Sequence, residues 1–487
     1  MPHSIRWFPW CKNTFAKAAA ENKPILMYLT AHWCAWCAVM DDTTYRDPQV
    51  INMVEDNFIP MKVNIDQFPH VADRYHFGGY PSVVFLSGDG QIMKGENFLS
   101  GELMKNVLTE VLEEYQRRKK SPSFKKKKNR PGQTKVTGKL EHNTESSLSI
   151  TEINRVITNA YDREYGGFIV TDREWKFPYP EIHDYLLLYT ESNPGSYEEM
   201  MVKKTLQAMW AGEIYDHRRG GFFRFCEARD WTLPHAEKLL DINAALIRNY
   251  LTAYDKLGWD QYGVLIKDTI NYLTLELYHD DAQLFGGSRI GKEMDPTPFT
   301  NWNSMMSSSL LLAYRVLGEK EYLERGLKVI DSLWAGRYRL GRGMSHFYLN
   351  GPVEVELLSD QVKYIEALYH AYMSTGEKTY LNRAFLLLRY IEKNYRLPEG
   401  NFSDIPLTEK NPGYLSIPLV PFIENVDVAL IYIRMFHLCG LKAYLQRADE
   451  IMQSLTLMMR GNPVFAAKYG QGMLEMENSR LKNCSTN

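Results

Sequence analysis

The sequence predicts a multidomain protein in which a small α/β domain is followed by an all-α toroid built from six helical hairpins. Three observations lead to this prediction. The chain has 487 residues, and a single hydrophobic core stops growing at roughly 250–300 residues. Residues 1–116 alternate between apolar strands and amphipathic helices, whereas almost every long segment after residue 149 has helical periodicity. A glycine-rich phrase recurs between these later helices, which indicates an internal repeat.

The composition is that of a folded protein and excludes several classes. Hydrophobic residues make up 45% and charged residues 24% of the chain, which excludes a disordered protein. No uncharged apolar run approaches the ~20 residues that cross a bilayer. The N-terminal segment lacks the apolar stretch and the small-residue cleavage site of a signal peptide. We therefore expect a soluble, cytoplasmic protein that does not contact a membrane.

The first domain, residues 1–116, is predicted from the order of its elements. A turn at Ser87-Gly88-Asp89-Gly90 separates the last two strands, and an amphipathic helix closes the domain. Strands that alternate with helices and end in a hairpin favour a small α/β layer. The expected helices cover residues 13–22, 37–42, 49–56 and 102–115, and the expected strands cover 24–30, 58–65, 82–86 and 91–93.

Among the six cysteines only Cys34 and Cys37 form a CxxC, and this pair follows a predicted strand and begins a helix. The helix dipole stabilises a thiolate at Cys34, so we expect Cys34 to be the nucleophile and Cys37 the resolving thiol. Tyr80-Pro81 supplies a proline, cis or trans, that is expected to face the sulfur atoms. The alternatives are half of a zinc site and two inert buried thiols. Zinc needs four ligands, and His32 is the only nearby addition, so we expect no metal.

Residues 117–148 are predicted to be a basic, flexible linker. Eleven basic residues and no acidic residue lie between Arg117 and Lys139, while the rest of the chain has 46 basic and 59 acidic residues. Segments with so few apolar residues do not bury enough surface to order themselves. An acidic protein with one basic segment is not a general nucleic-acid binder. A solvated tether is the favoured interpretation, and a nuclear-localisation or polyanion-binding segment is the alternative.

The second domain, residues 149–487, is predicted to contain about twelve helices. Their connections repeat one phrase, in which an aspartate precedes a pair of glycines. Six hairpins that close on themselves make an α/α toroid. An open solenoid is the alternative, but it would need polar capping repeats that the sequence does not show. The repeats are Asp162…Gly166-Gly167-Phe168, Asp216…Gly220-Gly221-Phe222, Asp280…Gly286-Gly287 and a degenerate Leu340-Gly341…Gly343. Helices are expected near 149–162, 180–192, 197–214, 235–256, 261–279, 301–317, 319–336, 358–375, 377–394, 422–438, 441–458 and after Pro463.

Short motifs in both halves match one known family. In the first half they are Ile5-Arg6-Trp7, FAKAAAENKP at 15–24, CAWCAVM at 34–40, VNID at 63–66 with Pro69 and Tyr75, and Gly79-Tyr80-Pro81. In the second half they are Gly166-Gly167-Phe168 with Lys176-Phe177-Pro178, Gly221-Phe222 with PHAEK at 234–238, Trp302-Asn303, and Asp360 with Tyr369. With these motifs the chain resembles the spermatogenesis-associated protein 20 family. The resemblance implies a thioredoxin-like domain fused to an (α/α)6 toroid of the six-hairpin glycosidase and sugar-epimerase type.

The chain departs from the pattern of this family near the cysteines and in the toroid. Its motif resembles CHWCHVM, whereas Ala35 and Ala38 replace both histidines here. Tyr28 stands where thioredoxins usually carry a buried acid that helps to deprotonate the second cysteine. A tyrosine with an ordinary pKa of about 10 is a poor proton acceptor, so we expect slow disulfide turnover. After PHxEK the family tends to have a tyrosine and then an aspartate, whereas this chain has Asp241 one position early.

The candidate residues for chemistry in the toroid are carboxylates, because glycoside hydrolysis needs two that face each other across the sugar. His235 is the candidate for acid–base work of the kind an epimerase requires. Each of these side chains has a structural alternative as a helix cap, an ion-pair partner or a packed aromatic ring. We expect Lys176, Trp231, His235, Glu237 and Asp241 to converge at the mouth that carries the glycine-rich loops. The carboxylates expected near the starts of inner helices are Glu237, Asp241, Asp360 and Glu424, and the rings that could stack on a sugar are Trp175, Phe177, Trp231 and Trp302.

The favoured function is a thiol–disulfide oxidoreductase without a cofactor, whose site is Cys34, Cys37 and Pro81 and whose partner is a protein thiol or disulfide. One alternative is a carbohydrate-active hydrolase or epimerase with an accessory thioredoxin-like domain and a carbohydrate ligand. The other is a non-catalytic scaffold. The lining of the toroid distinguishes these hypotheses, because two facing carboxylates about 5–10 Å apart favour glycosidic chemistry, whereas an apolar or basic lining does not.

Overall fold

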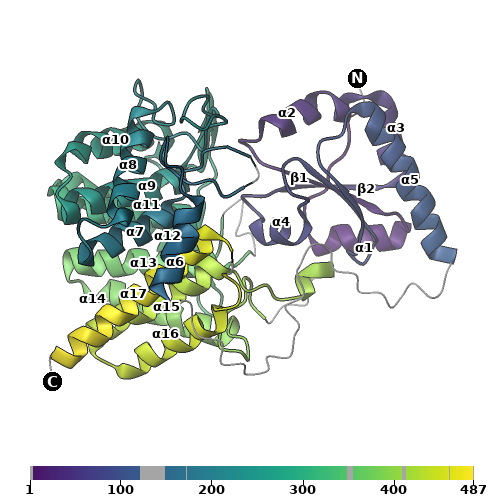
Figure 1. Ribbon diagram of the computed structural model, residues 1–487. Helices are drawn as coiled ribbons and strands as arrows, with labels where there is room; N and C mark the ends of the chain where they lie inside the picture. Colours follow the sequence, from purple (N-terminus) through teal and green to yellow (C-terminus); the bar gives the residue numbers. More distant parts are fainter. Residues whose placement is uncertain are drawn as a thin grey trace. The chain divides into compact units, whose positions relative to one another are not determined.

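The structure is a computed structural model that describes residues 4–120, 149–171, 173–347, 355–407, 413–459 and 461–485. The chain divides into two compact units, Met1–Ser146 with Glu409–Pro418, and Ser147–Thr408 with Leu419–Asn487. The first unit is α/β and the second is almost entirely helical (Figure 1). Of the predicted linker, residues 121–148 lie outside the described residues, whereas 117–120 continue helix α5 (Gly101–Lys120).

The first unit is built on a four-stranded sheet with the order β2-β1-β3-β4. Strand β1 pairs in parallel with β2 and antiparallel with β3, and β3 pairs antiparallel with β4. The central strands β1 and β3 are fully buried, because ILMYLT and SVVFL have apolar side chains for both faces. Helices lie on both faces of the sheet (Figure 1). The strands are β1 Ile25–Thr30, β2 Ile59–Asn64, β3 Ser82–Leu86 and β4 Ile92–Glu96, and the helices are α1 Lys12–Glu21, α2 Ala35–Asp42, α3 Pro48–Asn57, α4 Pro69–Tyr75 and α5.

A short segment from far along the chain completes the first unit. The 3₁₀ turn η4 (Gly413–Ser416) packs on helix α4. The guanidinium of Arg74 donates to the carbonyl of Tyr414 at 3.1 Å and to that of Ile417 at 2.9 Å. The hydroxyl of Tyr75 accepts from the backbone N–H of Tyr414 at 3.0 Å. Neither helix α4 nor this segment was predicted from the sequence.

The second unit is a closed ring of helical hairpins. Its described residues contain twelve helices, six of which form an inner ring. Each inner helix packs on the next, and α17 packs on α7, which closes the ring and confirms a toroid rather than an open solenoid. The inner helices are α7 Pro180–Ser192, α9 Leu240–Leu257, α11 Thr300–Leu317, α13 Leu358–Thr375, α15 Phe422–Cys439 and α17 Pro463–Ser485, and the outer helices are α6 Ile150–Ala160, α8 Tyr197–Ala211, α10 Gly263–Leu277, α12 Lys320–Arg337, α14 Lys378–Asn394 and α16 Lys442–Leu455.

One side-chain contact recurs at the start of four inner helices and explains why the glycine-rich phrases repeat. The fourth residue of α9, Asn243, accepts from the backbone N–H of Phe222 at 2.7 Å and donates to its carbonyl at 2.9 Å. Asn303, Gln361 and Asn425 make the same pair of bonds with Phe285, Met344 and Phe402. The long connections therefore lie at the N-terminal ends of the inner helices, as predicted. Gly220 and Gly221, with φ of 80° and 77°, provide the backbone conformation that the second connection needs.

The predicted helix over 235–256 begins later than expected, which corrects the placement of two candidate residues. Helix α9 begins at Leu240, and Glu237–Leu239 is strand β5, which pairs antiparallel with β8 (Ser288–Ile290). The backbone groups of this segment are satisfied by a ladder to the next connection, and so no helix is needed to pair them. His235 and Glu237 are therefore not at a helix start. The remaining small elements are β6 Tyr278–His279, β7 Leu284–Phe285, β9 Glu293–Asp295, β10 Tyr338–Arg339, β11 Gly343–Met344 and η3 Asp260–Tyr262.

The described helices differ in length and in apolar character. None of them combines the length and the apolar character that crossing a bilayer requires. The cytoplasmic location stays a prediction.

Candidate functional sites

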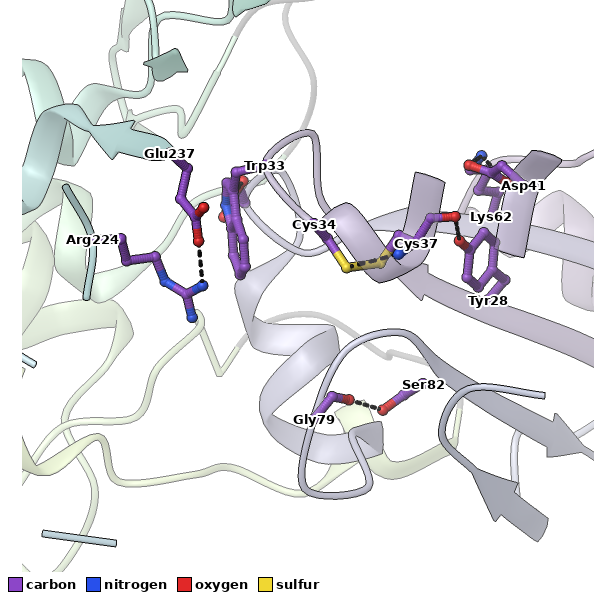
Figure 2. Close-up of a disulfide and its surroundings, with 11 residues drawn as sticks. Tyr28, Trp33, Cys34, Cys37, Asp41, Lys62, Gly79, Ser82, Arg224 and Glu237 are labelled. Carbon is purple, nitrogen blue, oxygen red and sulfur yellow. Dashed lines mark hydrogen bonds and ion pairs between the residues drawn. A yellow bond between two sulfur atoms is a disulfide. The ribbon is translucent and has the colours of Figure 1, made fainter. Parts of the chain in front are cut away.

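Cys34 and Cys37 form a disulfide at the start of helix α2 (Figure 2). Cys34 is the N-cap residue, and its Sγ accepts a hydrogen bond from the backbone N–H of Cys37 at 3.2 Å. Cys34 retains 7% of its surface and Cys37 retains 1%. The same N–H and the helix dipole would stabilise a thiolate on Cys34 once the disulfide is reduced.

Two contacts hold the residue before the disulfide. The indole N–H of Trp33 donates to the carboxylate of Asp66 at 2.8 Å. Its ring meets that of Tyr80 edge-on with centroids 6.3 Å apart. The Tyr80–Pro81 peptide bond is cis, and Pro81 is buried. The next residue, Ser82, donates its hydroxyl to the carbonyl of Gly79 at 2.6 Å, which closes the turn (Figure 2). The turn that contains Pro81 therefore lies beside the CxxC motif.

Tyr28 stands where thioredoxins usually carry a buried acid, and its contacts with the motif are as follows. Its hydroxyl donates to the carbonyl of Cys37 at 3.0 Å (Figure 2). Lys62 on β2 places its ammonium 5.2 Å from the ring centre and pairs with Asp41 at 2.9 Å. Burial, and then the carboxylate of Asp41, raise the pKa of Tyr28 above its ordinary value. A carboxylate is thus present near the motif, but it comes from α2, one helical turn after Cys37, and the sequence analysis did not single it out.

Apolar side chains are exposed on helix α2 and beside it. Trp36 is 59% exposed and Val39, one turn further on, is 42% exposed. The ring of Trp36 meets Phe98 edge-on at 5.3 Å, and Phe98 is itself 38% exposed. Ala35 and Ala38, which stand where the family has histidines, are both exposed and leave this surface without a titratable group of their own.

In the toroid, Lys176 and Trp231 belong to a buried cluster. The ammonium of Lys176 donates to Asp162 at 2.7 Å and to the carbonyl of Gly166 at 2.6 Å, and it lies 5.5 Å from the ring of Trp231. Arg229 also donates to Asp162, at 2.8 Å. Burial raises the pKa of Asp162, but the hydrogen bonds from Arg229 and Lys176 outweigh this effect and lower the pKa to about 2. Lys176 is fully buried, so its ammonium holds the connection together rather than facing a ligand.

Lys238 repeats this arrangement in the next hairpin. Its ammonium donates to Asp216 at 2.8 Å and to the carbonyl of Gly220 at 2.7 Å. In both hairpins, therefore, a lysine that follows the glycine-rich motif binds the aspartate and a glycine carbonyl of that motif.

His235 and Glu237 form a second cluster with Arg224. The carboxylate of Glu237 pairs with Arg224 at 3.0 Å (Figure 2) and lies 3.5 Å from Nδ1 of His235. Nε2 of His235 lies 2.8 Å from Glu227. The imidazole stacks on Phe225 at 4.0 Å. Lys176 and Trp231 therefore contact each other, and His235 contacts Glu237. The convergence of all five residues at one mouth of the toroid stays a prediction.

The remaining carboxylates lie in the first turns of inner helices, as predicted. Asp241 is the second residue of α9, and its Oδ1 is buried with no hydrogen-bond partner among the described residues. Burial raises the pKa of Asp241 to about 6. Asp360, in α13, lies 2.8 Å from Nδ1 of His346 and accepts from the N–H of Asn301 at 3.1 Å. Glu424 is the third residue of α15 and is half-buried.

The candidate sugar-stacking rings lie in different places in the toroid. Trp175 and Phe177 both pack on Phe225, at 5.1 and 4.7 Å, beside the cluster of His235 and Glu237. Trp302 instead packs on Phe299 at 4.8 Å. Within the described ranges, no three histidine, cysteine or acidic side chains are grouped so that they could hold a metal ion.

Comparison with known proteins agrees with both units. Residues 1–131 match the family Thioredox_DsbH, described as a protein of unknown function, DUF255. Spermatogenesis-associated protein 20 of Homo sapiens is 28% identical over 323 residues. The chain is thus similar to spermatogenesis-associated protein 20 over this part of its length. The match covers 60% of this chain and only 39% of the human protein. The thiol:disulfide interchange protein DsbD of Escherichia coli (strain K12) is 32% identical over 79 residues, which cover 16% of this chain and 14% of DsbD.

The toroid is similar to solved structures of sugar-converting enzymes. Cellobiose 2-epimerase from Bacillus thermoamylovorans B4167 superposes with a TM-score of 0.56 at 11% identity, covering 66% of this chain and 95% of the epimerase. The GH76 α-mannanase BT2949 of Bacteroides thetaiotaomicron superposes with a TM-score of 0.53 at 12% identity, covering 69% of this chain and 96% of the mannanase. These similarities confirm a six-hairpin toroid of the glycosidase and epimerase type, and at such identities they concern the fold alone.

Proposed function

We propose that the first unit is a thiol–disulfide oxidoreductase in which Cys34 is the nucleophile and Cys37 resolves the mixed disulfide. The observation that carries this proposal is the Cys34–Cys37 disulfide, in which Cys34 caps helix α2 and is the more exposed partner. In the reduced protein, the Cys34 thiolate attacks one sulfur of a substrate disulfide, and the other sulfur leaves as a thiolate. The Cys37 thiolate then attacks Sγ of Cys34, which restores the Cys34–Cys37 disulfide and releases the second substrate thiol. Two electrons pass to the substrate, and a dithiol reductant returns them.

The surroundings of the motif support a protein substrate. Trp36, Val39 and Phe98 expose apolar surface next to Cys34, and contiguous exposed apolar surface marks interaction sites. The turn of Pro81 lies beside the motif on the side of Trp33. The similarity of this part of the chain to the named thiol:disulfide interchange protein favours the same class of reaction.

Reduction of insulin disulfides tests this function directly. The purified full chain, supplied with dithiothreitol, is expected to accelerate insulin reduction above the rate with dithiothreitol alone. Cys11 and Cys439 are free cysteines with no second thiol beside them in the described structure. They cannot resolve a mixed disulfide, so we expect neither to accelerate insulin reduction. No acceleration at any protein concentration would refute the proposal.

Asp241 favours a second function, acid–base chemistry on a carbohydrate by the toroid. A general acid near neutrality needs a raised pKa, and burial gives Asp241 a value of about 6. Its unpartnered Oδ1 leaves one oxygen available to a ligand. Arg224 lies near enough to lower its pKa, and the same arginine pairs with Glu237. Asp241 and Glu237 are therefore the two carboxylates proposed for this chemistry.

Calorimetric titration of the full chain with mono- and disaccharides tests the second function. Asp241→Asn and Glu237→Gln are expected to weaken binding by about tenfold or more, because each removes a charged hydrogen-bonding group. Glu227→Gln, a change at an exposed partner of His235, serves as the control. Loss of binding with an unchanged melting temperature would support the site. A lower melting temperature without any bound sugar would make these residues structural.

A further inference from the structure

The centre of the toroid contains a network of charged side chains that join the inner helices. Arg248 on α9 pairs with Asp184 on α7 at 2.5 Å. Arg434 on α15 pairs with Glu366 on α13 at 2.9 Å. The rest of the network is formed by Lys363, Asp427 and Lys468, in which Asp427 accepts from both lysines at 2.7 Å. Every carboxylate of this network therefore has at least one cationic partner.

Charges on inner helices that are not neighbours in the ring influence one another. Burial lowers the pKa of Arg248, but the carboxylates of Asp184, Glu366 and Asp427 outweigh this effect and raise it. Glu366 and Asp427 belong to α13 and α15, which are not neighbours of α9 in the ring. The influence of Glu366 and Asp427 on Arg248 therefore extends across the ring. Asp241 lies two turns before Arg248 on the same helix, toward the end where the long connections lie.

The two arginines are more accessible than the carboxylates with which they pair. The side chains of Arg248 and Arg434 retain 22% and 26% of their accessible surface, whereas Asp184 and Glu366 retain 8% and 9%. A guanidinium has five N–H donors. Among the described residues, Arg248 uses only Nη2 and Arg434 only Nη1 for hydrogen-bonding or ionic contacts. Both arginines thus keep donors that no described side chain satisfies.

The side chain of His370 lies within the electrostatic influence of these arginines. Burial, and then Arg434, lower the pKa of His370 to about 3, and Arg315 and Arg248 contribute although Glu366 opposes them. Its Nδ1 is buried without a hydrogen-bond partner in the described part of the chain. The cations of α9, α11 and α15 therefore outweigh the nearby carboxylate at His370.

We propose that the centre of the toroid binds a small ligand that carries a carboxylate or phosphate group, through Arg248 and Arg434. Planar guanidinium groups match both anions with paired hydrogen bonds. The carboxylates behind them fix the two arginines, so that little side-chain entropy is lost when the ligand binds. This site lies entirely in the second unit and does not depend on the disulfide chemistry of the first. It is also separate from the acid–base role of Asp241, since binding needs no proton transfer.

The test is calorimetry on the full chain at constant ionic strength with four probes: inorganic phosphate, glucose 6-phosphate, glucuronate and glucose. At least one anionic probe is expected to bind, and glucose is expected to bind at least about tenfold more weakly than the best of them. Binding of phosphate and the phosphorylated sugar but not glucuronate would assign a phosphate group, and the reverse would assign a carboxylate. No anionic probe bound at up to about 10 mM, or glucose bound equally well, would overturn the proposal.

Two variants locate the binding. The double variant Arg434→Gln, Glu366→Gln removes the cation together with its partner, so no unpaired buried carboxylate is left from this pair. Arg248→Lys keeps the positive charge beside Asp184 but removes the planar donor fork. Each is expected to weaken the best anionic probe by about tenfold or more, while Arg480→Gln, a change at a 61% exposed arginine on α17, is expected to have no effect. Unchanged binding in the folded Arg248→Lys variant would overturn the assignment even if the double variant fails to fold.

Discussion

Replacement of Cys34 by serine is expected to reduce insulin-disulfide reduction to the rate of dithiothreitol alone. The hydroxyl of serine does not ionise near neutral pH, so no nucleophile remains at the start of helix α2. Cys37 does not substitute for it, because Cys37 is only 1% exposed and a substrate disulfide cannot reach its thiol. The loss should occur without a change in fold, since the side chains differ by one atom at a site that is 7% exposed.

Replacement of Cys37 by serine separates the two steps of the cycle. The Cys34 thiolate can still attack a substrate disulfide, but the mixed disulfide has no resolving thiol. A covalent complex with a peptide disulfide should therefore accumulate and be visible by non-reducing electrophoresis and mass spectrometry. Cys439→Ser, which removes an exposed free thiol, is the matched control and should behave as the unchanged protein. Trapping in Cys34→Ser but not in Cys37→Ser would reverse the assignment, and no trapping in either would make the pair structural.

The fold was predictable to a large extent because its signals are local and repeated. The helices of the toroid follow from apolar periodicity, and the glycine pairs mark the connections before the inner helices. Closure of the ring through α7 and α17 follows from the number of hairpins. The late start of α9 was not predictable in this way, because strand β5 exists only through pairing with Ser288–Ile290, about fifty residues later. Such pairing overrides the helical pattern of a short segment.

The candidate sites were predictable only in their residue types. The CxxC motif gave the disulfide and its position on α2, since four neighbouring residues contain the whole signal. The surroundings of Tyr28 did not follow, because its hydroxyl donates to the carbonyl of Cys37 and Lys62, on a different strand, lies over its ring and pairs with Asp41. The central network was also missed, although Arg248, Glu366 and Arg434 are ordinary charged positions in helices. Only closure of the ring brings them together, and closure is not a property of any one hairpin.

One missed signal was present in the sequence. Lys176 follows Asp162 by 14 residues and Lys238 follows Asp216 by 22, and each aspartate comes four residues before a glycine pair. A lysine that recurs after a repeated phrase indicates a contact within the repeat rather than a ligand site. Because Lys238 has the same place after Asp216, the sequence already favours an ion pair between Lys176 and Asp162 over a ligand site at Lys176.

Replacement of Asp162 by alanine is expected to destabilise the toroid by about 3–5 kcal/mol, because it leaves the ammonium of Lys176 buried without a carboxylate. Only the carbonyl of Gly166 would remain to accept from it. Asp216→Ala in the equivalent pair should cost less. Asp216 is 17% exposed. Lys238 also lies 4.0 Å from the ring of Tyr272 and 4.7 Å from that of Phe223, closer than Lys176 lies to the ring of Trp231 at 5.5 Å, and these two rings stabilise its charge.

Urea unfolding followed by the helical circular dichroism signal measures these differences, since most helices belong to the toroid. Glu319→Ala, which breaks the exposed pair with Lys267, is the control and should leave the midpoint nearly unchanged. The double variant Asp162→Ala, Lys176→Met should recover much of the lost stability, because it removes the unpaired charge and fills the site with an apolar side chain of similar length. A double variant as unstable as Asp162→Ala would mean that the carboxylate acts mainly through Arg229 and the N–H groups of Glu164 and Tyr165, which also donate to it, and not through the buried lysine.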